Sequence, residues 1–171
     1  MEALKTKARL GGVFTMEHWR NGVLLATVRT KNLIVNEGLN RILDSTLHDD
    51  ALAAWFVALF EDDHSVAAGD DYETPGYTES TAYDEGTRPA YVEAAASSQS
   101  TTNSANKAVF TISGTKTIYG ASLVSVAAKG DSTPGADNDL MCAGKFSASR
   151  AVVDDDVLNV TYTISAADDG V

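Results

Sequence analysis

Residues 157–164 read Val-Leu-Asn-Val-Thr-Tyr-Thr-Ile, and this stretch decides the fold class. Every second side chain in it is large and apolar, which is the period of a β-strand with one buried face. The four apolar positions are Leu158, Val160, Tyr162 and Ile164. The preceding Asp154-Asp155-Asp156 predicts a turn, because aspartate suits turn backbone.

A hairpin is predicted near the other end of the chain, where Asn21-Gly22 lies between two strand-like runs. A two-residue turn there pairs Arg20 with Val23, Trp19 with Leu24, Glu17 with Ala26 and Thr15 with Val28. This register gives the hairpin two partly apolar faces. One holds Val13, Trp19, Leu24, Ala26 and Val28, and the other holds Phe14, Met16, His18 and Leu25.

Further strands are predicted from apolar runs and alternation. The run at 55–60 is typical of a buried strand, and Gly114-Thr115-Lys116 predicts a hairpin between strands at 107–113 and 117–126. Residues 97–104 are expected to be a polar loop. The remaining candidates are 76–81, 90–94 and 140–147.

One short helix is expected near 37–48, with Asn36 as its N-cap and Glu37 in the first turn. Its apolar residues recur at helical spacing and predict a face packed on the core: Leu39, Ile42, Leu43 and Leu47. About eight strands with no βαβ rhythm predict a mainly β protein. The expected fold is an antiparallel, jelly-roll-like β-sandwich.

Length and charge set the organisation. The 171 residues, with 13 basic and 24 acidic side chains, predict a basic arm at 1–9 and one sandwich domain at 10–171. That domain includes a long acidic loop region at 62–106. A net charge of −11 argues against general binding to nucleic acid. With neither a signal peptide nor a membrane-spanning run expected, synthesis in a cytoplasm is predicted.

Motifs for catalysis are not found in the sequence. The spacing of His18, His48 and His64 does not match a metal site, and Cys142 lies in a predicted strand as an inert thiol. We therefore expect a protein with no cofactor and no enzymatic activity. Paired acids at 62–63, 70–71, 137–139 and 154–156 leave a calcium site open, although adjacent acids on an extended chain point to opposite faces.

Aromatic side chains offer a second possibility. Trp19, Trp55 and the six tyrosines could form a platform on which a sugar stacks. Both tryptophans lie in apolar surroundings of the predicted strands, which favours a place in the core.

The stretch Lys31-Asn32-Leu33-Ile34-Val35-Asn36-Glu37-Gly38-Leu39-Asn40-Arg41-Ile42-Leu43 resembles the N-terminal part of small virion proteins of tailed bacteriophages. In these proteins a strand ends in Asn-Leu-(Ile/Val)-(Val/Thr)-Asn, followed by Gly-Leu and a short helix. The resemblance extends over residues 12–164. It implies a structural role in the virion, most like that of a capsid cement (decoration) protein, and it supplies no catalytic residues.

A cement protein is expected on the capsid surface, as a homo-oligomer that binds the major capsid protein and neighbouring copies of itself. It is made in the host cytoplasm and uses neither nucleic acid nor a membrane. The expected partner-binding residues are Leu4, Lys5, Lys7, Arg9, Leu10 and Arg20. A tail, fibre or head-to-tail connector component stays open as an alternative, as does a receptor- or carbohydrate-binding module.

Overall fold

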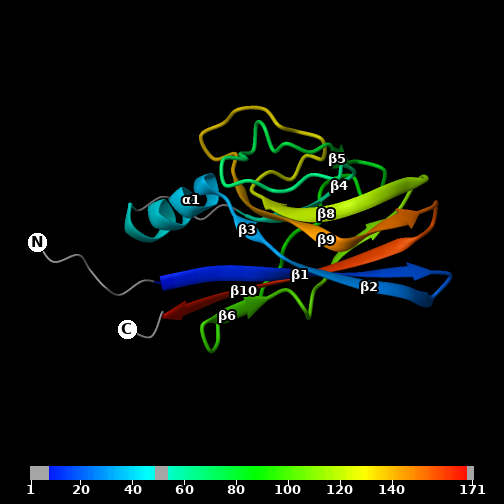
Figure 1. Ribbon diagram of the computed structural model, residues 1–171, viewed down its shortest axis with the longest axis horizontal. Coiled ribbons are helices and arrows are strands. Elements are labelled where there is room, and N and C mark those ends of the chain that lie inside the picture. The colour runs from blue at the N-terminus through cyan, green and yellow to red at the C-terminus, as the bar shows by residue number, and fades with distance from the viewer. Residues whose placement is uncertain (1–7, 49–53, 169–171) are drawn as a thin grey trace, which may run out of the picture.

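The computed structural model describes residues 8–48 and 54–168. Within them the chain forms two antiparallel five-stranded sheets and a single helix, α1 (Asn36–Leu47) (Figure 1). Sheet A comprises β1 (Ala8–Arg20), β2 (Val23–Lys31), β6 (Ser100–Thr102), β7 (Ala108–Thr111) and β10 (Val157–Asp168). Sheet B comprises β3 (Leu33–Ile34), β4 (Phe56–Phe60), β5 (Glu79–Ser80), β8 (Lys116–Val124) and β9 (Leu140–Val152). The predicted mainly β, antiparallel sandwich with one short helix is confirmed.

The strand that decided the fold class lies at the centre of sheet A. The sheet runs in the order β2-β1-β10-β6, with β7 pairing a second part of β10. Leu158, Val160 and Tyr162 are fully buried, as the alternation predicted, and Ile164 is partly buried against the same core. Tyr162 stacks on Phe14 of β1 with ring centroids 4.4 Å apart. The apolar core therefore fills the space between sheet A and sheet B.

The β1–β2 hairpin turns where expected, with both turn residues in the left-handed region (Asn21 φ 49°, Gly22 φ 74°). The first two predicted pairs are also correct. A β-bulge between His18 and Trp19 then shifts the register by one, so that Val28 faces Met16 instead of Thr15. The predicted faces are wrong for this reason: Val28 joins the buried face of Phe14, Met16 and His18.

The predicted hairpin at 114–116 is wrong. β7 pairs with β10 in sheet A, whereas β8 pairs with β4 and β9 in sheet B. The connection from β7 to β8, which contains Gly114, therefore crosses from sheet A to sheet B. Residues 97–104, expected to be loop, contain β6 and a tight turn at Ser98 and Gln99 with positive φ.

Long irregular segments cover the outer face of sheet B (Figure 1). Residues 61–93 and 125–139 form this cover, although Tyr83 and Tyr91 turn into the main core and contact Phe110 and Tyr162 of sheet A. The cover packs on a second apolar cluster, made of Val35, Ala58, Tyr72, Val124, Leu140 and Ala143. Two strands are predicted in this region, at 76–81 and at 90–94. The first contains only the two residues of β5, and the second contains only an isolated bridge between Ala90 and Phe56. The acidic region is thus a third layer with little regular structure.

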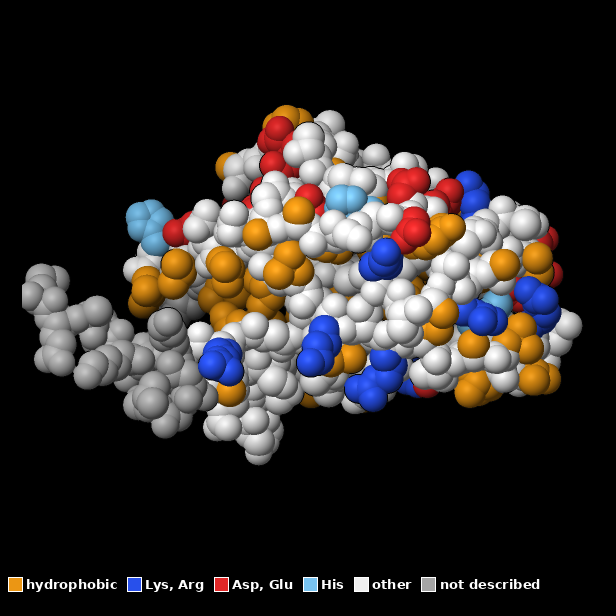
Figure 2. All heavy atoms as spheres, in the orientation of Figure 1, with side chains coloured by type: hydrophobic (Ala, Val, Ile, Leu, Met, Phe, Trp, Pro, Cys, Tyr) orange, Lys and Arg blue, Asp and Glu red, His pale blue; other side chains and the backbone are white. Residues whose placement is uncertain are grey.

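Charge differs between the two sides of the sandwich. Residues 8–31 hold four basic side chains and one acidic side chain, a net of +3, whereas residues 61–93 hold ten acids and one base. Figure 2 shows the acidic side chains over the cover and most of the visible basic ones along the lower half, over sheet A. The four bases are Arg9, Arg20, Arg29 and Lys31.

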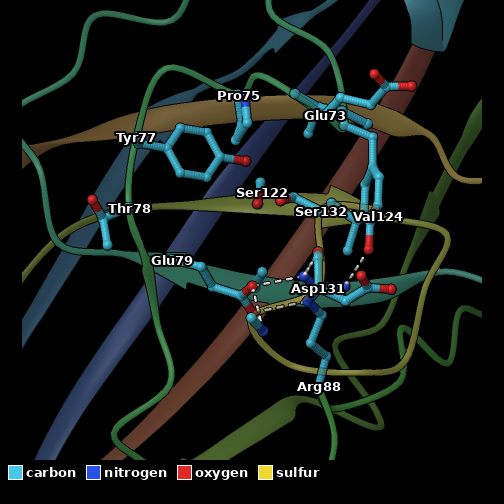
Figure 3. Close-up of a pocket in the computed structure, with 14 residues that line it drawn as sticks. Glu73, Pro75, Tyr77, Thr78, Glu79, Arg88, Ser122, Val124, Asp131 and Ser132 are labelled. Carbon is cyan, nitrogen blue, oxygen red and sulfur yellow. Dashed lines mark hydrogen bonds and ion pairs between the residues drawn. The ribbon is translucent and has the colours of Figure 1, made fainter. Parts of the chain in front are cut away.

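The cover is fastened by Arg88, which is almost completely buried. All five of its N–H groups donate hydrogen bonds, two to the Glu79 carboxylate at 2.8 and 2.6 Å (Figure 3). The other three go to the Tyr72 hydroxyl and to the carbonyl oxygens of Val126 and Asp131. This single guanidinium therefore joins the two segments of the cover to each other.

Candidate partner-binding surface

Helix α1 turns its leucines away from the protein. Leu39, Leu43 and Leu47 are 41%, 56% and 78% exposed, and Ile42 is half-buried. Of the four residues predicted to contact the core, Ile42 packs against it, and the prediction is wrong for the three leucines. The helix residues that are buried are Gly38 and Arg41. The N-cap is Val35 instead of Asn36, and it makes no side-chain cap bond.

Gly38 explains how the helix approaches the sheet. A Cβ atom at this position would lie 2.1 Å from the carbonyl oxygen of Met141, which is far inside contact distance. The helix backbone therefore rests directly on the backbone of β9, a contact that only glycine permits. Beside this close backbone contact, Ile42 is the side chain of the predicted apolar face that packs on the core.

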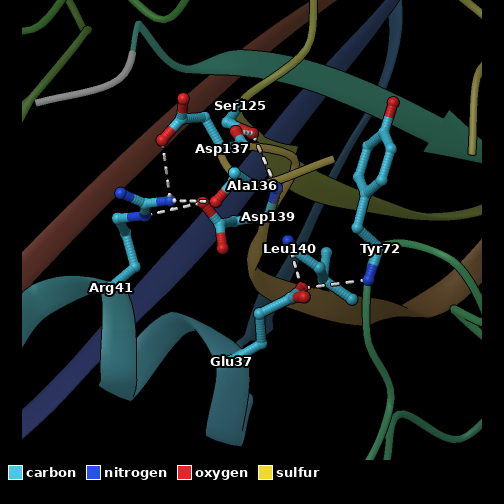
Figure 4. Close-up of polar contacts among 8 residues, drawn as sticks. All are labelled: Glu37, Arg41, Tyr72, Ser125, Ala136, Asp137, Asp139 and Leu140. Atoms are coloured by element: carbon cyan, nitrogen blue, oxygen red, sulfur yellow. Dashed lines mark hydrogen bonds and ion pairs between the residues drawn. The ribbon is translucent and has the colours of Figure 1, made fainter. Parts of the chain in front are cut away.

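Polar side chains complete the attachment of α1 (Figure 4). Arg41 donates from Nε to Asp139 at 2.6 Å, and from Nη2 to Asp137 at 3.3 Å and to the Ala136 carbonyl at 3.1 Å. Glu37 accepts hydrogen bonds from the backbone N–H groups of Leu140 (2.6 Å) and Tyr72 (2.9 Å). Burial raises the pKa of this carboxyl.

Sequence reasoning missed the roles of Glu37 and Arg41. Their spacing of four residues is typical of an exposed ion pair on a helix, which would leave the leucine side to face the core. The structure inverts that arrangement. Because the charged side faces β9 and the cover, the leucine face of α1 (Leu39, Leu43, Leu47) meets solvent.

The same end of the molecule carries further apolar surface. Leu10, near the start of β1, is 40% exposed. A shallow groove of about 390 Å³ lies beside it, lined by Gly11, Gly12, Val13, Lys31, Asn32, Thr163 and Ser165. Figure 2 shows apolar side chains over α1 that continue into the hollow between the helix and the strands below.

The predicted partner-binding residues do not form one surface. Leu4, Lys5 and Lys7 lie outside the described residues. Arg9 and Leu10 belong to β1, where they pair with Ala167 and Ala166, so sheet A begins at Ala8, inside the predicted arm. Arg20 ends the same strand, and ten residues of extended chain place it about 33 Å from Leu10.

Arg20 is engaged within the chain. Its Nε and Nη2 donate to the two carboxylate oxygens of Asp156 at 2.6 and 2.8 Å. His18 Nε2 lies 2.8 Å from the same carboxylate, and the backbone N–H of Val153 donates to it. The Arg20 guanidinium, with these neighbours, holds the pKa of Asp156 well below its usual range. Arg20 thereby fastens the hairpin tip to the β9–β10 turn.

The remaining chemical candidates are dispersed. In the part of the chain that the structure describes, no three His, Cys, Asp or Glu side chains are grouped to hold a metal ion. His64 pairs with Asp70 at 2.8 Å, and His48 is exposed after the end of α1. Cys142 is fully buried, and burial raises the pKa of its thiol to about 12.

Both tryptophans are partly buried, so neither forms an open platform. Within 8–48 and 54–168, no helix combines the length and apolar character that a membrane span requires. No family model, curated protein or solved structure matches this chain. The hypothesis about its role therefore depends on its residues and surfaces.

Proposed function

We propose that this chain is a non-enzymatic structural protein of a tailed bacteriophage virion, and more specifically a capsid cement protein. In this role it binds the major capsid protein and neighbouring copies of itself on the outer surface of the head. The observation that carries the proposal is the leucine face of α1, which stays exposed because polar contacts anchor the opposite side of the helix.

An aligned row of exposed leucines indicates a docking surface. Leu39, Leu43 and Leu47 follow one another at a spacing of four, so they lie along one side of the helix. Scattered apolar residues are normal on a protein surface, but a continuous apolar stripe marks a contact with another protein. An amphipathic helix that lies in a partner's groove uses this spacing of anchors.

The resemblance to phage virion proteins coincides with this surface. Residues 31–43, which carry the resemblance, supply the end of β2, the whole of β3 and the first part of α1. The pattern therefore corresponds to the element that presents the leucines. In many-copy assemblies, small contacts of this kind add up through symmetry and multivalency.

The division of charge supports contacts between copies. A subunit with a basic hairpin side and an acidic cover can align its basic side with the acidic side of a neighbour. Exposed pairs of this kind contribute little affinity and are screened by salt. They set orientation, while apolar contacts supply most of the binding free energy.

The direct test compares variants for binding to capsid shells of the phage that encodes the chain, prepared without this protein. Replacing Leu43 and Leu47 by Gln should leave the melting temperature unchanged and abolish binding, measured by co-sedimentation and by occupancy in electron micrographs. Val109→Gln, which changes an exposed apolar residue of β7 outside the hairpin, is the matched control and should bind like the parent.

Several outcomes would contradict the proposal. Full occupancy by the doubly substituted protein would exclude the leucine face as the docking surface. Absence of binding by the parent chain, with a closed ring of subunits in solution, would favour a connector. A labelled chain found on tails or fibres of purified virions would assign the protein to those structures.

A further inference from the structure

A pocket of about 340 Å³ lies between the outer face of sheet B and the cover (Figure 3). Its floor is apolar and comes from three strands: Ala58 of β4, Val124 of β8 and Leu140 of β9. Residues of the cover form the walls and rim. They are Tyr72, Glu73, Pro75, Tyr77, Thr78, Glu79, Arg88, Gly130, Asp131 and Ser132. The volume is at the lower end of the range for small-molecule sites, about 300–1,000 Å³.

One polar group of the floor makes no well-formed hydrogen bond within the described residues. Ser122 of β8 is fully buried, and its Oγ has no hydrogen-bonding partner of acceptable geometry among the described residues. The Tyr77 hydroxyl approaches Ser122 from the wall (Figure 3). Burial raises the pKa of Tyr77, so the group is a neutral hydroxyl at physiological pH. Each of these hydroxyls can both donate and accept.

Three of the four charged groups of the pocket, Arg88, Glu79 and Asp131, are already satisfied by the protein. Every N–H of Arg88 is used, so its guanidinium has no donor left for an anion. The Glu79 carboxylate accepts from Arg88 and from the Gly130 N–H, and Asp131 accepts from Thr133. With three acids and one base in the lining, the pocket has a net charge of −2, which disfavours phosphate and sulfate groups.

The walls are held in place before any ligand arrives. The Tyr77 ring stacks on Phe60 with centroids 4.4 Å apart, and the Tyr72 hydroxyl accepts from Arg88 at 3.1 Å. Binding to such a site requires little ordering of side chains, which favours affinity for a small ligand.

We propose that this pocket binds the ring of a neutral sugar. The apolar floor suits the C–H face of the ring, and the Tyr77 hydroxyl, with the buried Ser122 Oγ behind it, can exchange hydrogen bonds with a hydroxyl group at its edge. The Glu73 carboxylate at the rim accepts from hydroxyls that point outward. This binding goes beyond the assembly role and does not depend on it, because the leucine face of α1 contributes no residue to the pocket.

The experiment uses the full chain and a panel of methyl glycosides of neutral hexoses and N-acetylhexosamines. Saturation-transfer and chemical-shift NMR titrations would detect a weak site with a Kd in the millimolar range. At least one glycoside should bind, with shifts at amides around Ser122. Tyr77→Phe and Ser122→Ala should each weaken binding about fivefold, the loss expected for one hydrogen bond. Tyr119→Phe, on β8 but outside the pocket, should leave the Kd unchanged.

Three results would overturn the proposal. One is failure of every glycoside to bind at concentrations up to about 50 mM, well above a millimolar Kd. Another is a glycoside Kd that neither substitution changes. The third is preferential binding of tetramethylammonium, which would indicate a cation site. Ser122→Ala only removes a hydroxyl, so it keeps the test valid if Tyr77→Phe does not fold.

Discussion

The two faces of sheet B are packed in different ways. The inner face meets sheet A through apolar side chains alone over much of its area, with Val57, Leu59 and Ile118 essentially inaccessible to solvent. The outer face is covered by irregular segments and by α1, and two buried arginines, Arg41 and Arg88, hold these in place. Alternating apolar residues of the strands thus stabilise the inner face, and specific polar pairs hold the elements that cover the outer face.

This difference explains where both proposed surfaces arise. On the inner face, the large apolar side chains are buried in the core between the two sheets. On the outer face, the polar anchors hold the cover and the helix, so that the leucines of α1 and the hydroxyl of Ser122 are not needed for that purpose. Both proposed surfaces therefore lie on the outer side of sheet B.

The largest expected effect tests the inner face. Leu59→Ala should lower the free energy of unfolding by about 4 kcal/mol, because a fully buried leucine leaves a cavity. Urea denaturation measures the change. The exposed Leu25 is the matched control, and Leu25→Ala should cost less than about 0.5 kcal/mol. Equal losses in the two variants would contradict the assignment of Leu59 to the core.

The outer face should respond to loss of its anchor. Arg88→Met leaves the largely buried Glu79 carboxylate without its charged partner, which should cost about 3 kcal/mol. Because the segments at 72–79 and 126–132 then lose the hydrogen bonds through Arg88 and keep the direct bond from the Gly130 N–H to Glu79, hydrogen exchange should increase most in those two segments. Amide hydrogen exchange in β10 should increase only by the amount that the loss of global unfolding free energy accounts for.

Arg29→Met supplies the control for Arg88→Met, because Arg29 is an exposed arginine on β2. It should alter neither stability nor exchange. If the loss of Arg88 accelerated exchange evenly across both sheets, the cover would not be an independent unit. The distinction between the two faces of sheet B would then not hold.

What the sequence could predict follows the same division. Alternation in 157–164, the apolar run at 55–60 and the Asn21-Gly22 turn each act locally, and the structure confirms all three. The β-bulge beside Trp19 and the sheet change after β7 depend on tertiary packing, which the local pattern does not contain. The apolar spacing of α1 predicted the core contact of Ile42 correctly but not that of the leucines, because Gly38 and Arg41 supply the rest of the contact.

The candidate surfaces were harder to predict for the same reason. Arg88 and Glu79 are nine residues apart in a segment rich in acids, where a single arginine is typical of solvent-exposed chain. Ser122 stands among apolar neighbours on β8 and gives no signal of a pocket. Only the fold shows that Tyr77, from the cover, lies opposite it.

Acid should weaken the hairpin end of the sandwich. Asp156 has a folded-state pKa below that of the unfolded chain, since Arg20, the Val153 N–H and His18 stabilise its charged form. This stabilisation is fully present above the unfolded pKa of about 4 and is lost as pH falls through the lower folded pKa. Asp156→Asn should cost about 2 kcal/mol at pH 7.

Urea midpoints measured from pH 7 to pH 2 check this prediction. Below about pH 4 the parent should lose stability more steeply than the Asp156→Asn variant, because only the parent has this carboxylate to protonate. Parallel curves for the two proteins would show that Asp156 does not contribute to acid sensitivity. The inner face of sheet B, which is apolar, should add nothing to the difference.

The smallest expected effect concerns the turn that sets the register of β1 and β2. Gly22 has φ 74°, and a Cβ atom there would have no heavy atom within 4 Å, so any cost of substitution comes from the backbone conformation alone. Gly22→Val should therefore destabilise by about 1–2 kcal/mol, because a branched residue resists the left-handed region.

Gly114 has the same open space without a positive φ, and Gly114→Val should change stability by less than about 0.5 kcal/mol. Thermal melts of the pair separate strain from crowding, since crowding is absent at both sites. An equal loss of stability in Gly22→Val and Gly114→Val would show that the left-handed turn conformation is not the cause. Hydrogen exchange in the cover should stay unaffected by Gly22→Val beyond the global change, because the turn touches neither Arg41 nor Arg88.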